Sequence, residues 1–450
     1  MGTRVPTTDP PNTPPRSVTD WLAHLRQRLG AWLAALVKPH ERPALIVAVV
    51  YFFCVLAAYY VVRPIRDQLS AAVGSTALPI FYLSTFVATL SLTPLYGALV
   101  ARFPRRVFVP VVYAFFVLGM MAFIPLFAMQ DAIGARLLGS VFFVWVSVFN
   151  LFVVAVFWSF MADLFDAAQS HRLFPLIALG GAAGAIAGPM LTRGLNDLVG
   201  VSGLLVVSSV LLGAAIYCVF ALSRWSKAHP VAGERRDERI IGGSFLAGAI
   251  ETLKSPIMRR IALLMLLGDA VGTVIYAFLA DYNGAANATR QARIDFAAEI
   301  DLWTNVLQAL FQVSITRMLM VRIGPAAALA LDGVVKAVML AAFAVLGGPA
   351  IAVTAIATRA SAYGIFKPAS DSLYTQVDAE TRYKTKNFID TSVWRFGDVA
   401  VNGGLNGLRY LGATQPMLAL LTVVAAAFSA RIGWGAARML EARGKAPARS

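Results

Sequence analysis

The segment ALIVAVVYFFCVLAAYYVVRPIRDQL, residues 44–69, is apolar as far as Val62 and then carries Arg63, Arg66 and Asp67. An apolar run of about 20 residues is the length of a helix that spans a hydrocarbon core of about 30 Å. The whole chain of 450 residues is 58% hydrophobic and only 14% charged, too little polar surface to cover a soluble globule of that size. The composition therefore predicts an all-α membrane protein with many spans.

Hydropathy along the chain predicts twelve transmembrane helices. Their expected bounds are 42–67, 76–101, 107–129, 132–164, 172–194, 200–224, 256–281, 296–317, 323–347, 350–376, 387–410 and 414–438. The longest connection, 225–255, contains the charged run ERRDER and divides the spans six plus six. This pattern predicts two six-helix bundles, at 42–224 and 256–438, joined by a cytoplasmic linker.

The two ends of the chain are expected to be cytoplasmic tails, residues 1–41 and 439–450. In the first tail, apolar residues such as Trp21, Leu25 and Leu29 recur at helical spacing, which predicts an amphipathic helix at 18–38. Such a helix lies on the membrane surface or packs against the cytoplasmic side of the protein itself.

The basic residues indicate the orientation of the spans. The formal net charge is +15, and most Lys and Arg residues fall in the segments that a cytoplasmic N-terminus places inside. We therefore expect a bacterial inner-membrane protein with both termini in the cytoplasm. The same distribution explains the positive charge without a nucleic-acid partner.

Several other sequence features are expected to be structural. Cys54 and Cys218 lie in apolar spans and are expected to be buried free thiols. The run GGAAGAIAG at 180–188 lies inside the fifth span, where small residues let helices approach closely. The sequence contains no phosphate-binding loop and no His/Cys cluster with metal-ligand spacing, so we expect neither an enzyme nor a cofactor.

Charges at membrane depth in the first span form the first candidate site. Ionisable groups there are costly unless they face water or a partner, so they indicate function. Tyr59, Arg63, Arg66 and Asp67 share one helical face, and Arg63 and Asp67 are four residues apart. They are expected to line a cavity wall, and the alternative is that the arginines extend to the outer headgroups.

The eighth span carries a polar stripe at helical spacing. It consists of Asp301, Asn305, Gln308, Gln312 and Thr316. Such a stripe lines a transport pathway or forms a hydrogen-bonded seam between helices. Asp301 is also the candidate proton-binding carboxylate if transport is coupled to protons.

The tenth span combines cations and an aromatic residue on one face: Arg359, Tyr363, Lys367 and Asp371. This combination suits an anionic solute, and a purely structural charge network is the alternative. Further candidates for the same site are Asp163 at the end of the fourth span and Asp390, Arg395 and Asp398 in the eleventh.

Four further charged residues have more than one interpretation. Asp332 and Lys336 in the ninth span are four residues apart and are expected to neutralise each other. Asp269 and Asp281 in the seventh span serve either proton coupling or the solvation of helix ends.

Three segments resemble signature regions of the nucleotide transporters, the ATP/ADP translocases of plastids and intracellular bacteria, and especially the shorter bacterial relatives of that family. They are RPIRDQL at 63–69, FWSFMADLFDAAQSHRLFPLIALGGAAG at 157–184 and YTQVDAETRYKTKNFIDTSVWRFGD at 374–398. The resemblance implies a fold like that of the major facilitator superfamily and transport of nucleotides. Two positions depart from the family pattern, since Arg66 replaces a lysine and Asp398 replaces a cation.

Together these features predict a monomeric secondary transporter in the lipid bilayer. Its substrate is expected to be a small anionic solute, a nucleotide or another phosphorylated metabolite, bound between two bundles that rock about a midplane cavity. The alternatives are a proton-coupled exporter of other organic compounds and a membrane receptor or scaffold that does not transport.

Overall fold

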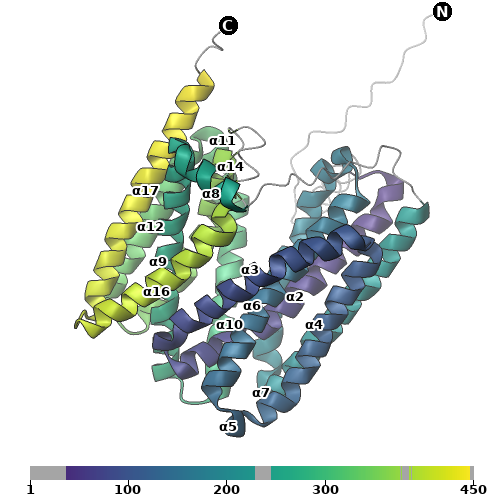
Figure 1. The fold of residues 1–450 in the computed structure, drawn as a ribbon, viewed down its shortest axis with the longest axis horizontal. Coiled ribbons are helices and arrows are strands. Elements are labelled where there is room, and N and C mark those ends of the chain that lie inside the picture. Colours follow the sequence, from purple (N-terminus) through teal and green to yellow (C-terminus); the bar gives the residue numbers. More distant parts are fainter. Residues whose placement is uncertain (1–36, 229–244, 375–376, 378–384, 387, 446–450) are drawn as a thin grey trace, which may run out of the picture.

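The computed structural model describes residues 37–228, 245–374, 377, 385–386 and 388–445. In these residues the regular structure is entirely helical. The helices form two bundles that lie side by side, one from the N-terminal half of the chain in purple to teal and one from the C-terminal half in green to yellow (Figure 1). The predicted fold class is confirmed.

The N-terminal bundle is built from long apolar helices. They are α2 (Arg42–Val73), α3 (Leu78–Arg102), α4 (Arg105–Ala128), α6 (Ala135–Leu164) and α7 (Ala167–Ala228), with the short turns η1 (Pro39–Glu41), η2 (Ser75–Ala77) and α5 (Gln130–Ile133). The helix α7 contains two spans, because the backbone at Gly200 has φ 61° and ψ −169° and breaks the helix. Glycine adopts this positive φ at little cost.

The C-terminal bundle contains three helices that are interrupted by π-helical turns. Its elements are α8 (Phe245–Lys254), α9 (Pro256–Ala286), α10 (Arg290–Leu310), η3 (Phe311–Thr316), α11 (Arg317–Arg322), α12 (Pro325–Leu346), α13 (Ala350–Ser361), η4 (Ala362–Phe366), α14 (Lys367–Tyr374), η5 (Ile389–Val393), α16 (Trp394–Tyr410) and α17 (Gln415–Lys445). Turns of this kind are frequent at functional sites. Here they fall in the eighth, tenth and eleventh predicted spans.

The helices account for all twelve predicted spans. Eight described helices are long and apolar enough to cross a membrane, and one of them, α7, contains two spans. The other three spans are the interrupted ones, whose polar stripes lower their mean hydropathy. The observed bounds differ from the predicted ones at several helix ends. Helix α2 extends to Val73 and α17 to Lys445, α10 begins at Arg290, and α8 lies within the predicted linker. The predicted helix at 18–38 falls outside the described residues except at its last two positions.

The glycine-rich run of α7 packs closely against α2, which agrees with the close helix packing that the sequence predicts. A Cβ atom at Gly180 would lie 2.3 Å from the carbonyl oxygen of Val49, and one at Gly184 would lie 2.3 Å from that of Phe53. Contacts this short are possible only because these positions have no side chain. The two helices therefore form a closely packed pair within the N-terminal bundle.

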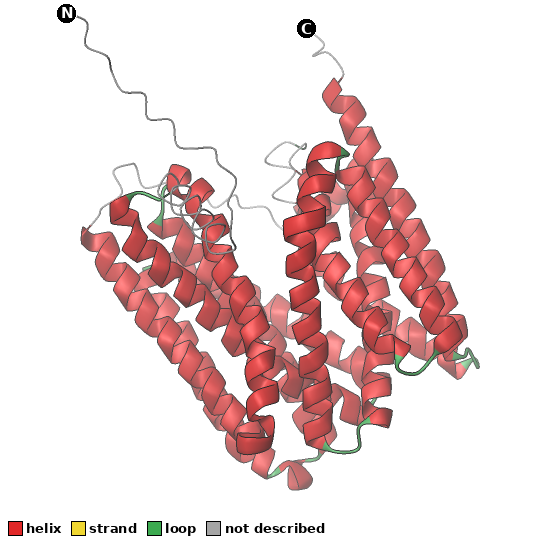
Figure 2. Ribbon diagram, turned by 180° about the vertical axis from the view of Figure 1, so that it is seen from behind, coloured by secondary structure: helices red, strands yellow, loops and turns green. Residues whose placement is uncertain are grey.

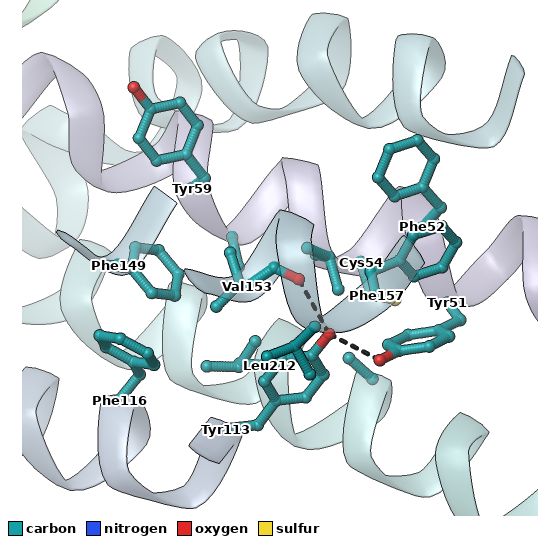
Figure 3. Packing of buried hydrophobic residues seen from close by; sticks show 14 of the residues in the cluster. Tyr51, Phe52, Cys54, Tyr59, Tyr113, Phe116, Phe149, Val153, Phe157 and Leu212 are labelled. Atoms are coloured by element: carbon teal, nitrogen blue, oxygen red, sulfur yellow. Dashed lines mark hydrogen bonds between the residues drawn. The ribbon is translucent and has the colours of Figure 1, made fainter. Parts of the chain in front are cut away.

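An aromatic core fills the rest of this bundle (Figure 3). The ring of Tyr51 packs edge-on against that of Phe157, with 4.7 Å between the ring centroids. The Tyr51 hydroxyl lies 2.6 Å from the hydroxyl of Tyr113, which in turn donates to the carbonyl oxygen of Val153. Buried tyrosine hydroxyls thus have partners inside the core. Cys54 is a buried free thiol in this core, and Cys218 is a second one.

The two bundles are not parallel. They approach each other most closely at the end where α5 lies, and they diverge toward the end where α17 finishes (Figures 1 and 2). Between the bundles, α10 packs against both α2 and α7, and α9 packs against α2. Charged residues of the two halves therefore meet along α2, α9 and α10.

Candidate functional site

Asp301 lies at the centre of the contact between the bundles. This carboxylate of α10 is fully buried, with 0% of its side chain exposed, and its Oδ1 atom is 2.7 Å from Nη2 of Arg359 in α13. The same oxygen is 3.4 Å from Nη1 of Arg63, which belongs to α2 in the other bundle. Residues far apart in the chain thus form an ion pair across the two halves.

Asp67 of α2, whose side chain is 12% exposed, is the second carboxylate of this contact. Its Oδ1 accepts hydrogen bonds from Nε and Nη2 of Arg66, at 2.9 and 2.7 Å. The hydroxyl of Tyr276 in α9 donates to the same oxygen at 2.9 Å, again across the bundles. Nε of Arg63 lies 3.8 Å from Oδ2 of Asp67 and connects the two carboxylates into one network.

We call this network the central cluster, and it consists of Arg63, Arg66, Asp67, Tyr276, Asp301 and Arg359. Three guanidinium groups face two carboxylates, so the cluster has a formal surplus of one positive charge. Aromatic rings help to hold the cations. The guanidinium of Arg66 lies 5.0 Å from the centre of the Phe143 ring and that of Arg63 lies 5.5 Å from the Tyr60 ring.

A small cavity borders the central cluster. Its volume is about 20 Å³, and its polar lining comes from Asp67, Tyr276, Asn283 and Arg359. This volume is about what one water molecule needs. In this conformation the arginines of the cluster pair with the protein's own carboxylates. An anion larger than water would have to displace those carboxylates from the arginines.

A second group of charges lies closer to the end where the bundles diverge. We call Lys367, Asp371, Lys386 and Asp390 the inner cluster, because they lie toward the side that the sequence predicts to be cytoplasmic. Nζ of Lys367 is 3.3 Å from Asp371 and 3.9 Å from Asp390, and Nζ of Lys386 is 3.3 Å from Asp390 and also bonds to Asp371. These side chains are 29–41% exposed, against 0–15% for the charges of the central cluster. Access to water therefore increases toward this end.

Aromatic rings also flank the inner cluster. Nζ of Lys386 lies 4.7 Å from the centre of the Tyr374 ring, and Nζ of Lys367 lies 5.7 Å from that of Trp394. Lys386 lies in the connection between α14 and η5. Burial disfavours its charged form, but the hydrogen bond to Asp371 and the charge of Asp390 outweigh this, and the pKa of Lys386 is raised.

Asp398 and Arg395 form a third, separate group. Oδ1 of Asp398 accepts a hydrogen bond from the hydroxyl of Thr273 in α9 at 2.7 Å, and Oδ2 lies 3.7 Å from Nη1 of Arg395. Nearby, the indole of Trp394 donates to Asp269 of α9. Asp398 is thus buried between α9 and α16, inside the C-terminal bundle. The carboxylate of Asp398 therefore already has partners within the protein.

The remaining candidates lie outside the three groups. Nδ2 of Asn305 donates to the carbonyl oxygen of Ala185 at 2.7 Å, so this part of the polar stripe forms a seam between α10 and α7. Tyr363 is 46% exposed in η4, and Asp163 is exposed one residue before the end of α6. The structure therefore brings together most of the predicted charges, but in separate groups.

The ninth span behaves as its spacing predicts. Nζ of Lys336 lies 2.8 Å from Asp332, both side chains are 3% exposed, and the hydroxyl of Ser361 donates to Asp332 at 2.7 Å. The pair neutralises itself within the C-terminal bundle.

Two members of these groups were not among the sequence candidates. Tyr276 has no signal in the sequence, because an aromatic residue in an apolar span is ordinary. Lys386 has a signal, since it stands four residues before Asp390 and the two form an ion pair.

The chain matches no protein-family profile and no curated sequence. Its fold is similar to that of several solved transporters. A bacterial homologue of the human lysosomal transporter Spinster, inward-facing and unoccupied, superposes with a TM-score of 0.62 at 13% identity over 92% of this chain and 100% of that one. The nucleoside transporter NupG gives 0.59 at 12% identity over 91% and 100%. An inward-facing bacterial homologue of ferroportin gives 0.62 at 15% identity over 90% and 100%.

These similarities define the class of fold. The chain shares the two-bundle helical fold of these solved transporters over nine-tenths of its length.

Proposed function

We propose that this protein is a secondary transporter that carries an anionic solute across the bacterial inner membrane by alternating access. The central cluster is the observation that carries this proposal. It is buried at the contact between two bundles, and its three arginines outnumber its two carboxylates. Buried charges in a membrane mark substrate and ion pathways.

The chemistry of the cluster favours an anion with several oxygen atoms. Guanidinium groups are planar and present paired N–H donors that match carboxylate and phosphate groups. Arg63 and Arg359 now share the single carboxylate of Asp301. A phosphate group could replace that carboxylate as their partner. The substrate class that fits is therefore a nucleotide or another phosphorylated metabolite, which agrees with the resemblance in the sequence.

The same contacts provide a mechanism for alternating access. Arg63 and Asp301 belong to different bundles, so their ion pair contributes to one relative position of the bundles. An anion that binds Arg63 and Arg359 weakens this pair and changes the balance between the two states. A ligand can shift such an equilibrium only by its difference in affinity for the two states. Exchange of the carboxylate for the substrate supplies that difference.

The inner cluster supports a path from the central cluster to the side where the bundles diverge. Lys367 and Arg359 belong to the same helical rod, α13 to α14, eight residues apart. Their side-chain exposure rises from 15% at Arg359 to 29% at Lys367. An anion that moves along this path could therefore contact Arg359 first and Lys367 next, or the reverse.

Uptake into proteoliposomes tests this function. A panel of labelled nucleotides, phosphate esters, and neutral and cationic solutes is offered to the purified protein. We expect saturable uptake of a phosphorylated anion that falls at least about tenfold in Arg359→Ala, because a bidentate charged contact is lost. Arg431→Ala, at an exposed arginine of α17, is the matched control and should transport normally. Uptake restricted to neutral or cationic solutes, or anion binding without uptake, would contradict the proposal.

A further inference from the structure

The end where the bundles converge is joined by a polar contact among three residues. Oδ1 of Asp281, near the end of α9, accepts from the backbone N–H of Ser75 at 2.9 Å, and its Oδ2 accepts from the Ser75 hydroxyl at 2.7 Å. Nη2 of Arg409, near the end of α16, lies 2.9 Å from the same Oδ2, and its Nη1 donates to the Ser75 hydroxyl. Ser75 belongs to the N-terminal bundle, and the other two residues belong to the C-terminal one.

A glycine next to this contact lets the helices come together. A Cβ atom at Gly284 of α9 would lie 2.3 Å from the carbonyl oxygen of Ala71 in α2. Side chains do not tolerate such a distance to a backbone atom, so any other residue at Gly284 would push α9 and α2 apart. Gly284 is one helical turn beyond Asp281, at the same end of the same helix.

These contacts continue the seam that begins at the central cluster. Asp67 and Ala71 are one turn apart on α2, and Ser75 follows just beyond the end of that helix. Each meets α9, through the hydroxyl of Tyr276, the backbone at Gly284 and the carboxylate of Asp281. A motion that separates α2 from α9 at this end therefore also strains the contact between Tyr276 and Asp67.

Other polar bonds cross between the bundles at this end. Nδ2 of Asn196 donates to Asp295 at 2.9 Å, and Nδ2 of Asn406 donates to the carbonyl oxygen of Thr76 at 3.1 Å. By contrast, the inner cluster at the opposite end is partly exposed to water. The structure thus has one closed and one accessible end.

We propose that Asp281, Ser75 and Arg409, together with the close approach of Gly284 to Ala71, form the gate that closes the outer end of the transport pathway. This assignment rests on the proposed transport by alternating access. Opening the gate breaks the bonds of Asp281 and lets α2 move away from α9, which exposes the central cluster on the outer side. The side chains of Asp281 and Arg409 are 35% and 24% exposed. Partly solvated ion pairs are weak, so the gate can open and close reversibly.

The distance between the bundles at this end is the direct test. Spin labels are placed on Leu198→Cys and Leu411→Cys, one in each bundle, which are both 80% exposed. The native Cys54 and Cys218 are replaced in this background, because both are free thiols. Distances are measured by pulsed electron spin resonance in lipid nanodiscs.

We expect a single short distance for the parent protein. Gly284→Ala should shift the distribution to longer distances, because its Cβ atom cannot coexist with the closed gate. Asp281→Asn should raise the ratio of open to closed protein at least about fivefold, which is the lower end of the usual range of coupling between two sites. Two controls keep the parent distribution. They are Gly272→Ala, on the same helix with no atom within 4 Å of its Cβ, and Asp131→Asn, an exposed aspartate at the same end.

The assignment is overturned if folded Asp281→Asn keeps the parent distribution. If Gly284→Ala does not fold, the result for Asp281→Asn decides. The measurement needs no substrate. A protein that passes this test but carries no anion would therefore refute the proposed substrate and leave the gate intact.

Discussion

Removing the carboxylate of Asp301 should destabilise the protein more than any other single change of charge in the central cluster. Asp301→Asn leaves the guanidinium groups of Arg63 and Arg359, at 3.4 and 2.7 Å, facing a neutral amide. Breaking a buried ion pair by removing one partner costs about 3–5 kcal/mol. Since Arg359 is 15% exposed, water compensates part of this loss, and we expect about 3 kcal/mol.

A double-mutant cycle measures this contribution. The free energy of unfolding is determined in mixed micelles with increasing denaturing detergent for Asp301→Asn, Arg359→Gln and the double variant. The double variant should be more stable than the sum of the two single effects predicts, by at least about 1 kcal/mol, because it leaves one cation fewer without a partner. Asp131→Asn, at an exposed aspartate, should change stability little. A loss below about 1 kcal/mol in Asp301→Asn, or additive single effects, would refute the ion-pair argument.

Three further predictions follow from individual contacts. Gly184→Ala should lower the free energy of unfolding by about 1–3 kcal/mol, because its Cβ forces α7 away from α2. The control Gly213→Ala, with open space around its Cβ, should lower it little. An equal loss in both variants would contradict this prediction. Tyr276→Phe should cost about 1.5 kcal/mol, because the Asp67 carboxylate loses a hydroxyl donor, and an unchanged unfolding curve would show that the bond contributes nothing. Because the pKa of Lys386 is raised, its charge should stabilise the protein below the pKa of an unfolded lysine, about 10.4, and this contribution should be lost as the pH rises through the folded value. Lys386→Met should therefore remove stability at pH 8 and flatten the pH profile above 10, and a parallel profile would contradict the ion pairing.

Hydropathy predicted the spans well because it is a local property of the chain. A helix in a bilayer satisfies its own backbone, so each apolar stretch reports its structure without reference to other helices. Polar stripes and π-helical turns interrupt the apolar pattern in the spans formed by α10, α13 and α16. Even there, helical spacing placed Asp301 and Arg359 on polar stripes, and the two side chains meet in the structure.

Pairing between distant helices could not be predicted in the same way. Arg63 shares Asp301 with Arg359, and Tyr276 donates to Asp67, although nothing in the sequence indicates these partners. The surroundings of Asp398 could not be predicted from the sequence either. Its hydrogen-bond partner is Thr273 on α9, and it is not part of the central cluster. Which charges meet depends on how helices rotate and approach one another, and small residues such as Gly284 set that approach.

The sequence by itself therefore determined the membrane class, the twelve spans and the helix faces that carry charge, because these depend on residues close together in the chain. Only the tertiary structure decided how those charges divide into a central cluster, an inner cluster and a group of polar contacts at the end where the bundles converge. The physical reason is that the energy of a buried charge depends on the groups within a few ångströms of it. Those groups come from helices that the chain brings together only when both bundles are assembled.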